Sequence, residues 1–273
     1  ENLVITELTL NQINNALSFF KHHDLVMNQW GLNHTHKNSK RMCINFYGPP
    51  GTGKTMAAHA VADQLDKKLM IINYAEIESK YVGDTPKNLV SAFKAAEKND
   101  AIIFFDEADA MLSRRVSNMK SSTDTSVNQT RSVLLNILND YEKVILFATN
   151  FIENFDPAFM RRILAHVKFE LPNEDCRKKL FEAYTPPTMP HTINFDLLAK
   201  SHNEISGSDI SNAILLAAFS AAERKSDKVE MIDIESSLNQ IKRSKIENNG
   251  NVKIETREVS QEHVESTLGI KLK

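Results

Sequence analysis

The sequence predicts an α/β fold in which a five-stranded parallel sheet is flanked by helices and followed by a small C-terminal all-helical unit. Short apolar segments alternate with helix-like segments as far as residue 171. These apolar segments are hydrophobic almost without interruption, which is typical of parallel strands covered on both faces. Between Pro172 and Lys245 no strand-like segment follows, and the apolar residues recur at helical spacing.

The elements are expected in a regular order. A helix over residues 1–22 has one apolar face, and a polar loop rich in Asn, His and Lys follows over residues 31–40. The expected strands are residues 42–47, 69–72, 101–105, 144–148 and 166–171. The helices expected between these strands are residues 55–65, 87–98 and 126–141.

Three units organise the chain: a large α/β domain over residues 1–172, a helical domain over residues 173–245, and a tail over residues 246–273. Within the tail, the pair Asn249 and Gly250 is favoured in tight turns, so we expect a hairpin there, followed by a short helix. Because the tail is polar, a disordered tail is the alternative. The helices of the second unit are expected over residues 174–184, 196–200, 208–224 and 232–242.

Composition narrows the class of protein. The 273 residues carry a formal net charge of only −2, so no global charge draws the chain to nucleic acid or to an anionic membrane. Cys43 and Cys176 are isolated and form neither a disulfide framework nor a zinc site, which favours a reducing compartment, the cytoplasm. No apolar run reaches the length of a membrane span. Since the first residue is Glu1 and not Met, we expect a fragment or a processed chain with a segment upstream.

A glycine-rich loop joins the first expected strand to the next helix and fits the pattern G-x-x-x-x-G-K-[S/T]. Its glycines let backbone N–H groups turn toward phosphate oxygens, and the helix N-terminus adds its dipole. Lys54 would reach the β- and γ-phosphates of a nucleotide, and the Thr55 hydroxyl would bind Mg²⁺. A turn without function is the alternative, which the preceding strand and the following helix disfavour. The loop consists of Gly48, Pro49, Pro50, Gly51, Thr52, Gly53, Lys54 and Thr55.

Two acids, Asp106 and Glu107, end the third expected strand. The carboxyl end of a parallel strand lies at the ligand-binding edge of the sheet. Asp106 would bind Mg²⁺ through its water shell, and Glu107 would polarise an attacking water. The alternative is a solvated acid pair, and the phosphate loop favours the catalytic interpretation. Asp109 follows closely and is assigned no role.

The fourth expected strand ends in Thr149 and Asn150. An Asn at this place would lie beside the γ-phosphate, between the loop and the acids, where it could orient the water. A turn-forming Asn is the better interpretation from local chemistry alone. The surrounding architecture favours the catalytic one.

Arg161 and Arg162 follow a short apolar segment after the fourth strand. An Arg at the edge of one subunit can stabilise transition-state charge in the site of a neighbouring subunit. Either of the two could take this role. A solvated or salt-bridged pair at a helix end is the alternative.

These elements, in this order and followed by a helical unit, resemble the AAA+ ATPase superfamily over about residues 1–245. The resemblance implies a P-loop NTPase fold that binds ATP and Mg²⁺, with residues 48–55 as the Walker A motif, Asp106 and Glu107 as Walker B, and Asn150 as sensor 1. The helical unit would be the lid.

Within the superfamily, the chain resembles the classical AAA branch. The Arg161-Arg162 pair and the segment after it are similar to the meiotic clade of spastin and katanin, and other segments resemble single-ring ATPases of bacteria and their phages. Classical members lack a sensor-2 arginine. The chain has Ser208 and Asp209 at that place, which agrees with this branch, and Gly207 and Ser208 would contact the nucleotide. The family's usual residue at position 208 is Ala or Gly, so Ser208 is a small departure.

The segment Lys80, Tyr81, Val82 and Gly83 matches the pore loop of this branch, which lines the central channel of the ring. An aromatic ring can grip an extended peptide with little sequence preference, and glycine lets the loop move. An ordinary surface Tyr is the alternative. Residues 117–125 would form a second pore-facing loop.

The leading functional hypothesis is a homo-oligomer, a hexameric ring, that hydrolyses ATP to remodel, unfold or disassemble a protein client through its central pore. The first alternative is an AAA+ ATPase associated with nucleic acid, which the aromatic Tyr81 and the near-neutral chain disfavour. The second is a nucleotide-dependent assembly switch without hydrolysis, which the complete set of motif residues disfavours.

Overall fold

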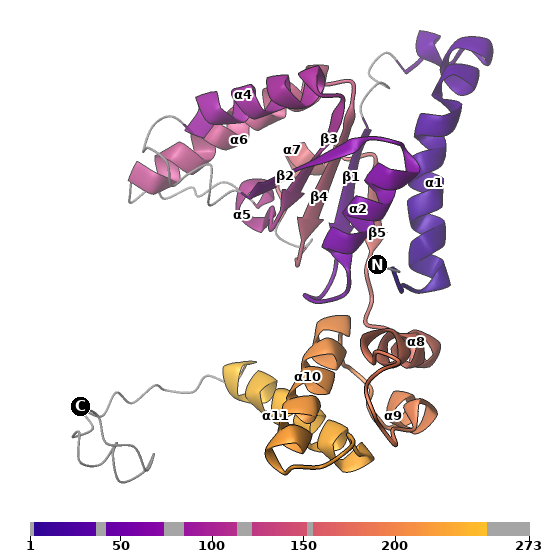
Figure 1. Cartoon of the computed structure of the whole chain (residues 1–273). Coiled ribbons are helices and arrows are strands. Elements are labelled where there is room, and N and C mark those ends of the chain that lie inside the picture. The colour runs from indigo at the N-terminus through magenta and orange to yellow at the C-terminus, as the bar shows by residue number, and fades with distance from the viewer. Residues whose placement is uncertain (1–2, 37–41, 74–84, 114–121, 152–154, 250–273) are drawn as a thin grey trace.

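The computed structural model describes residues 3–36, 42–73, 85–113, 122–151 and 155–249. Figure 1 shows a sheet with helices on both sides and a helical unit beneath it. The strands are β1 Met42–Tyr47, β2 Lys68–Asn73, β3 Ala101–Asp106, β4 Val144–Thr149 and β5 Ala165–Lys168. The helices around the sheet are α1 Glu7–Asp24, α2 Lys54–Gln64, α4 Thr85–Lys98, α5 Asp109–Leu112, α6 Ser122–Asp140 and α7 Pro157–Met160. All strand pairs are parallel, so the predicted five-stranded parallel sheet flanked by helices is confirmed.

The order of the strands in the sheet is β2-β3-β4-β1-β5. Strand β4 therefore lies between β1 and β3, although it follows both of them in the chain. Tyr47 at the end of β1 lies opposite Thr149 at the end of β4. Because parallel strands end at the same edge of the sheet, the segments that leave β1, β4 and β3 are neighbours in space.

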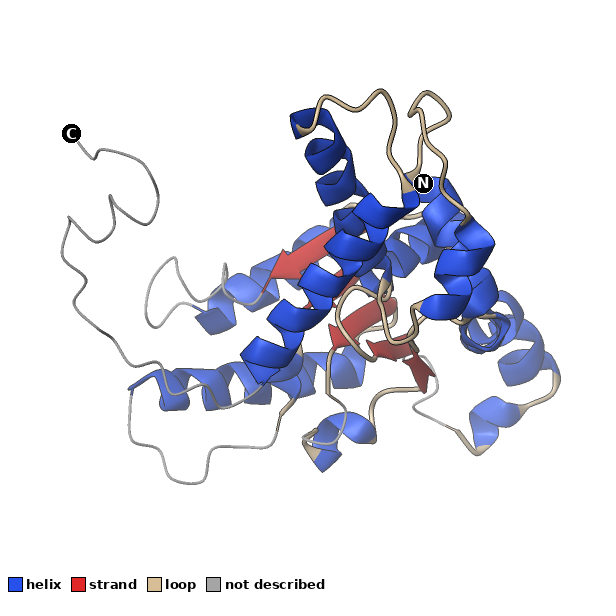
Figure 2. Ribbon diagram, turned by 90° about the horizontal axis from the view of Figure 1, so that it is seen from below, coloured by secondary structure: helices blue, strands red, loops and turns tan. Residues whose placement is uncertain are grey.

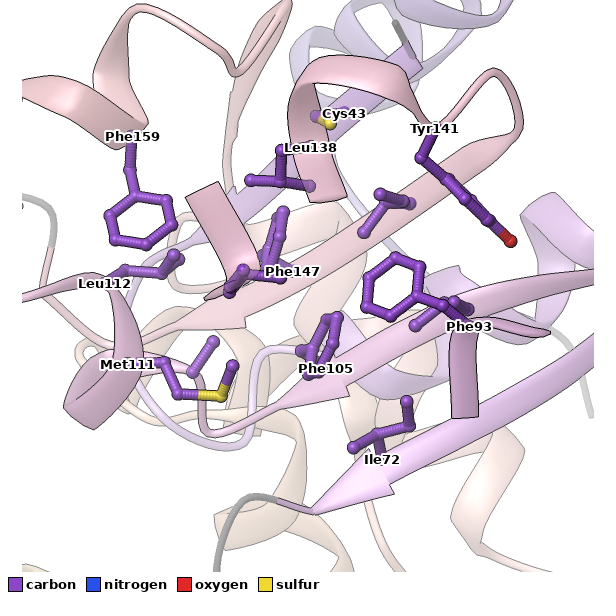
Figure 3. Packing of buried hydrophobic residues seen from close by; sticks show 14 of the residues in the cluster. Cys43, Ile72, Phe93, Phe105, Met111, Leu112, Leu138, Tyr141, Phe147 and Phe159 are labelled. Carbon is purple, nitrogen blue, oxygen red and sulfur yellow. The ribbon is translucent and has the colours of Figure 1, made fainter. Parts of the chain in front are cut away.

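Side chains of the central strands alternate between two apolar clusters, which explains why the strand sequences are apolar throughout. Phe105 and Phe147 belong to the cluster beneath α4 and α6, whereas Phe104 and Leu146 belong to the cluster beneath α1 and α2. The rings of Phe105 and Phe147 stack with centroids 5.3 Å apart. Figure 3 shows them beside Phe93 of α4.

The strands give way to four helices, α8 Glu174–Tyr184, α9 Phe195–Ser201, α10 Gly207–Glu223 and α11 Met231–Asn249. Three of these helices begin at a polar cap, because the side chains of Asn173, Asn194 and Ser206 each accept a hydrogen bond from a backbone N–H in the first turn. The helices pack around an apolar cluster of their own. Figure 2, seen from below, shows the helices of the chain in blue around the red strands of the sheet.

Two expectations for local structure were wrong. Helix α11 continues to Asn249, so residues 246–249 are helical and do not form the first strand of the expected hairpin. The helix is prolonged because no Gly or Pro interrupts it before Gly250, and Lys245 near its end pairs with Asp209 of α10. The rest of the tail lies outside the described residues. The expected helix over residues 1–22 begins only at Glu7. A π-helical turn, Leu25–Gln29, precedes the expected loop over residues 31–40, and that loop includes a 3₁₀ turn, Leu32–His34.

Replacing Phe147 with Ala should lower the free energy of unfolding by about 3–5 kcal/mol, because the change opens a cavity against a stacked buried ring. Urea denaturation followed by circular dichroism measures the loss. Phe151 follows the same strand and is 68% exposed. The matched variant Phe151→Ala should therefore change the free energy of unfolding by less than about 0.5 kcal/mol. Equal losses for the two variants would contradict this packing.

Candidate functional site

The glycine loop after β1 has a backbone that only glycine accommodates at two positions. Gly48 has φ 144° and Gly51 has φ 73°, both in the region that side chains avoid. A Cβ atom on Gly48 would lie 1.9 Å from the carbonyl oxygen of Phe169, and one on Gly51 would lie 2.0 Å from Oγ of Ser208. The loop is thus held between the chain that leaves β5 and the start of α10.

Lys54, the first residue of α2, folds back across this loop. Its Nζ donates to the carbonyl oxygens of Gly48 at 2.7 Å and Pro49 at 3.0 Å, and to Oδ1 of Asn150 at 3.0 Å. Burial lowers the pKa of Lys54, and the negative charges of Asp109 and Asp106 oppose that change. The lysine therefore connects the loop after β1 to the residue after β4.

The two acids predicted at the end of β3 lie on the other side of Asn150. Oγ1 of Thr55 donates to Oδ2 of Asp106 at 2.9 Å, so the hydroxyl and the carboxylate form a pair of oxygen ligands of the kind that Mg²⁺ prefers. Glu107 is exposed and has φ 51°, a left-handed conformation that is uncommon for a residue with a side chain. Its N–H donates to Oδ1 of Asp106 at 3.0 Å. Such strain often occurs at functional sites.

Asn150 lies at the carboxyl end of β4, between the loop and the acids, as the sequence analysis expects. Its side chain accepts the hydrogen bond from Lys54. Its backbone N–H donates to both carboxylate oxygens of Asp109, at 3.1 Å each, and the N–H of Phe151 donates to the same group at 3.2 Å. Asp109 is a residue to which sequence reasoning assigned no role. Its only signal was its nearness to Asp106 and Glu107.

These groups surround one cavity of about 760 Å³, a size suited to a nucleotide. The glycine loop, Asp106, Glu107 and Asn150 line one side of it. Residues 3–6 and parts of α8 and α10 line the rest. Sequence reasoning missed residues 3–6, because it assigned them to a helix over residues 1–22, whereas α1 begins only at Glu7. The other lining residues that it did not single out are Thr9, Met56, Phe169, Glu170, Leu180, Ala183, Tyr184, Ser211 and Asn212.

The start of α10 touches the glycine loop directly. The N–H of Ser208 donates to the carbonyl oxygen of Gly51 at 3.3 Å, and Gly207 lies against the same carbonyl. Behind this contact, Oδ2 of Asp209 accepts hydrogen bonds from the N–H and Oγ of Ser206 at 2.7 Å each and from Nζ of Lys245 at 2.6 Å. Both Gly207 and Ser208 therefore line the cavity, held by a charged and buried cap.

The structure distinguishes the two arginines after α7. Arg162 is held within its own chain, where Nε donates to Oδ1 of Asn139 at 3.0 Å and Nη1 donates to the carbonyl oxygen of Ala158 at 2.8 Å. Arg161 is exposed. Neither arginine is among the described residues that line the cavity. The structure of this chain therefore does not bring them together with Lys54 and the acids.

The expected pore loop, Lys80, Tyr81, Val82 and Gly83, lies outside the described residues. The expected second loop over residues 117–125 is only partly described. Its residues 122–125 belong to helix α6, so this part is helical and the expectation of a loop is wrong there.

A parallel sheet in this strand order, with a glycine loop after β1 and an acid pair at the end of β3, defines a P-loop nucleotide-binding domain. Comparison with known families agrees: residues 44–171 match the family described as "ATPase family associated with various cellular activities (AAA)". Residues 44–171 of this chain therefore belong to the AAA family, as the resemblance in the sequence implies.

Curated relatives extend the similarity to the helical unit. The chain is 34% identical over 202 residues to "Probable 26S proteasome regulatory subunit 4" of Caenorhabditis elegans, which covers 71% of this chain and 45% of the relative. It is 33% identical over 215 residues to "26S proteasome regulatory subunit 4 homolog" of Saccharomyces cerevisiae, which covers 76% of this chain and 49% of the relative. The chain thus spans about half the length of the curated relatives it matches. These relatives are proteasomal and do not bear on the finer likeness to spastin, katanin or phage ATPases.

The charge of Asp209 should stabilise the fold at neutral pH and cease to do so in acid. Burial would raise the pKa of Asp209, but the hydrogen bonds from Lys245 and Ser206 outweigh it and hold the pKa below its ordinary value of 3.8. A lowered folded-state pKa gives a contribution that is complete above the ordinary value and is lost as the pH falls through the folded-state value.

We therefore expect Asp209→Asn to lower the free energy of unfolding near neutral pH, and the difference from the parent to shrink below about pH 4. Urea denaturation over a pH series measures this difference. The exposed Asp63→Asn removes the same charge from α2 and should show no comparable pH-dependent difference. A loss for Asp209→Asn that stays constant with pH would show that the charge is not what stabilises the cap.

Proposed function

We propose that this chain is the ATP-hydrolysing module of an AAA ring that remodels a protein client. The observation that carries the proposal is the convergence of the glycine loop, the acid pair and Asn150 on one cavity. Two hydrogen bonds link these elements, from Lys54 to Asn150 and from Thr55 to Asp106. The site presents a cation, a hydroxyl, carboxylates and an amide around a glycine loop. This set of groups suits a nucleoside triphosphate.

Each group has a role in this proposal. Lys54 and the N–H groups of residues 51–55 bind the β- and γ-phosphates, and the cation stabilises charge that develops on them. Glu107 accepts a proton from the attacking water, and Asn150 orients that water. Gly207 and Ser208 contact the nucleotide from the helical side, so the lid over residues 173–245 can respond to it.

Mg²⁺ would be held by Thr55 and Asp106 and would neutralise charge on the β- and γ-phosphates when it is bound with ATP. Thr55 and Asp106 suit this ion, because a hydroxyl and a carboxylate are both hard oxygen ligands. Among the described residues, no group of three or more His, Cys, Asp and Glu side chains is arranged to hold a metal. That suits an ion that takes its other ligands from water and phosphate.

A ring completes the site in this proposal, because an arginine from a neighbouring chain would stabilise the transition state. The contacts favour Arg161, since the guanidinium of Arg162 is already engaged by Asn139 and Ala158. Within the AAA family, we retain the finer likeness to the meiotic clade and to single-ring ATPases as part of the proposal. The relatives' names, regulatory subunits of a proteasome, support a protein client.

The partners follow from the same reasoning: copies of this chain, six of them in the ring, and an extended polypeptide gripped by Tyr81 in the pore. None of the helices in the described part of the chain combines the length and apolar character that a membrane span requires. Nucleic acid is the less favoured client, and salt-sensitive binding of DNA would move the proposal toward it.

Replacing Glu107 with Gln should lower the rate of ATP hydrolysis at least about 100-fold, because the general base is lost. The affinity for ATP should change by less than about twofold, since the phosphate loop is intact. Phosphate release and titration with a fluorescent nucleotide measure the two quantities. Glu97→Gln makes the same change on the exposed face of α4 and should leave both unaltered. Hydrolysis at the parental rate by Glu107→Gln would contradict the assignment.

Mixing two inactive variants tests whether a site is shared between chains. Glu107→Gln and Arg161→Ala should each be nearly inactive alone. In a one-to-one mixture about a quarter of the sites should pair an intact Glu107 with an intact neighbouring Arg161, so about a quarter of the parental turnover should return. A mixture no more active than its components would exclude a shared site.

A comparison of Arg162→Ala with Arg161→Ala, each measured alone, identifies which arginine reaches the neighbouring chain. With Arg161 in that role, Arg162→Ala alone should retain more activity than Arg161→Ala. The reverse order would assign the role to Arg162.

A further inference from the structure

Asp109 is a charged residue near the site that the proposed mechanism does not use. It is the first residue of the four-residue helix α5, and it does not line the cavity. Its two carboxylate oxygens both accept from the N–H of Asn150 at 3.1 Å, and Oδ1 also accepts from the N–H of Phe151 at 3.2 Å. One side chain thus binds two consecutive amides of the chain that leaves β4. Hydrogen bonds to an ionised acceptor are about twice as strong as neutral ones.

The side chain of Phe151 cannot supply this anchoring by burial, because it is 68% exposed. Two backbone hydrogen bonds also link α5 and its N-cap to β4 and to the chain that follows it. The N–H of Ala108 donates to the carbonyl oxygen of Ala148 at 2.9 Å, and the N–H of Asp156 donates to that of Leu112 at 2.8 Å. The carboxylate lies between these two backbone bonds, where it holds the part of the segment that contains Asn150.

The positions of two residues of the proposed site, Asn150 and Glu107, depend on the segment that Asp109 binds. Asn150 accepts the hydrogen bond from Lys54, and a shift of its backbone would lengthen that bond. Glu107 lies two residues before Asp109 with its backbone in the left-handed region. Such a conformation persists only where the surrounding structure determines it, and the bonds of residues 108 and 109 to the β4 segment provide that constraint.

We propose that Asp109 is a positioning residue, which fixes Asn150 and Glu107 relative to each other and so sets the rate of hydrolysis without contacting ATP. The inference rests on the proposed ATPase function.

The test is Asp109→Asn, which keeps the shape of the side chain but replaces one acceptor oxygen with an NH₂ group that cannot accept a hydrogen bond. We expect kcat for ATP to fall about tenfold while the dissociation constant for ADP changes by less than about twofold. The amide protons of Asn150 and Phe151 should exchange with solvent faster than in the parent, as measured by nuclear magnetic resonance. Asp63→Asn, an exposed change of the same charge, should alter none of these quantities.

A double-mutant cycle separates positioning from a general structural role. In the Asn150→Ala background, Asp109→Asn should lower kcat by less than about threefold, because its main effect passes through the side chain that has been removed. An undiminished tenfold loss in that background would overturn the proposal, and so would an unchanged kcat for Asp109→Asn alone. If Asp109→Asn unfolds, Asp109→Glu gives the second test: the longer side chain keeps the charge but misplaces the carboxylate, and kcat should again fall with ADP affinity retained.

If the assembled parent protein showed no measurable hydrolysis, that result would contradict the proposed function and this inference together. Hydrolysis by the parent together with an unaffected Asp109→Asn variant would overturn this inference alone. The parental rate therefore distinguishes the two failures.

Discussion

Strand β4 lies between β1 and β3, and the arrangement of the whole site depends on that one placement. The glycine loop, Asn150 and the acid pair come from three strands that are far apart in the chain. Parallel pairing brings the ends of those strands to one edge, with Asn150 in the middle. Lys54 and Thr55, at the start of the helix after the loop, then reach Asn150 and Asp106 across that edge.

Close approach and strain at this edge are supported by the packing behind it. The apolar clusters on the two faces of the sheet pack β3 and β4 in place, and Phe105 and Phe147 stack on each other in the strands that lead to the acid pair and Asn150. On such a base, Glu107 can keep an uncommon backbone conformation, and Gly51 can lie where any side chain would collide with Ser208. Because Gly51 lies against Ser208, the position of the glycine loop depends on the position of α10.

Local patterns in the sequence were sufficient for some parts of this site and not for others. The phosphate loop and the acids are contiguous segments with a fixed relation to a strand, so their chemistry can be read directly. The contact between Asp109 and residues 150 and 151 joins distant segments, and no spacing reveals it. The same holds for the residues before α1 that line the cavity.

The helical unit gives a similar contrast. Its helix starts follow from polar caps such as Ser206, which sequence reasoning places within a residue or two. The expected end of the last helix, residue 242, falls short of Asn249, because the turn-forming pair Asn249 and Gly250 is visible in the sequence and the ion pair between Lys245 and Asp209 of another helix is not. The difference between Arg161 and Arg162 likewise became visible only from their contacts.

We propose that a site built at the ends of β1, β4 and β3 hydrolyses ATP only when a neighbouring chain completes it. The most direct measurement is the steady-state turnover of ATP per chain across a wide range of protein concentration. We expect turnover per chain to be negligible in dilute solution, to rise steeply as chains assemble, and to reach a plateau. Turnover per chain that stays constant down to concentrations at which the protein is monomeric would contradict it.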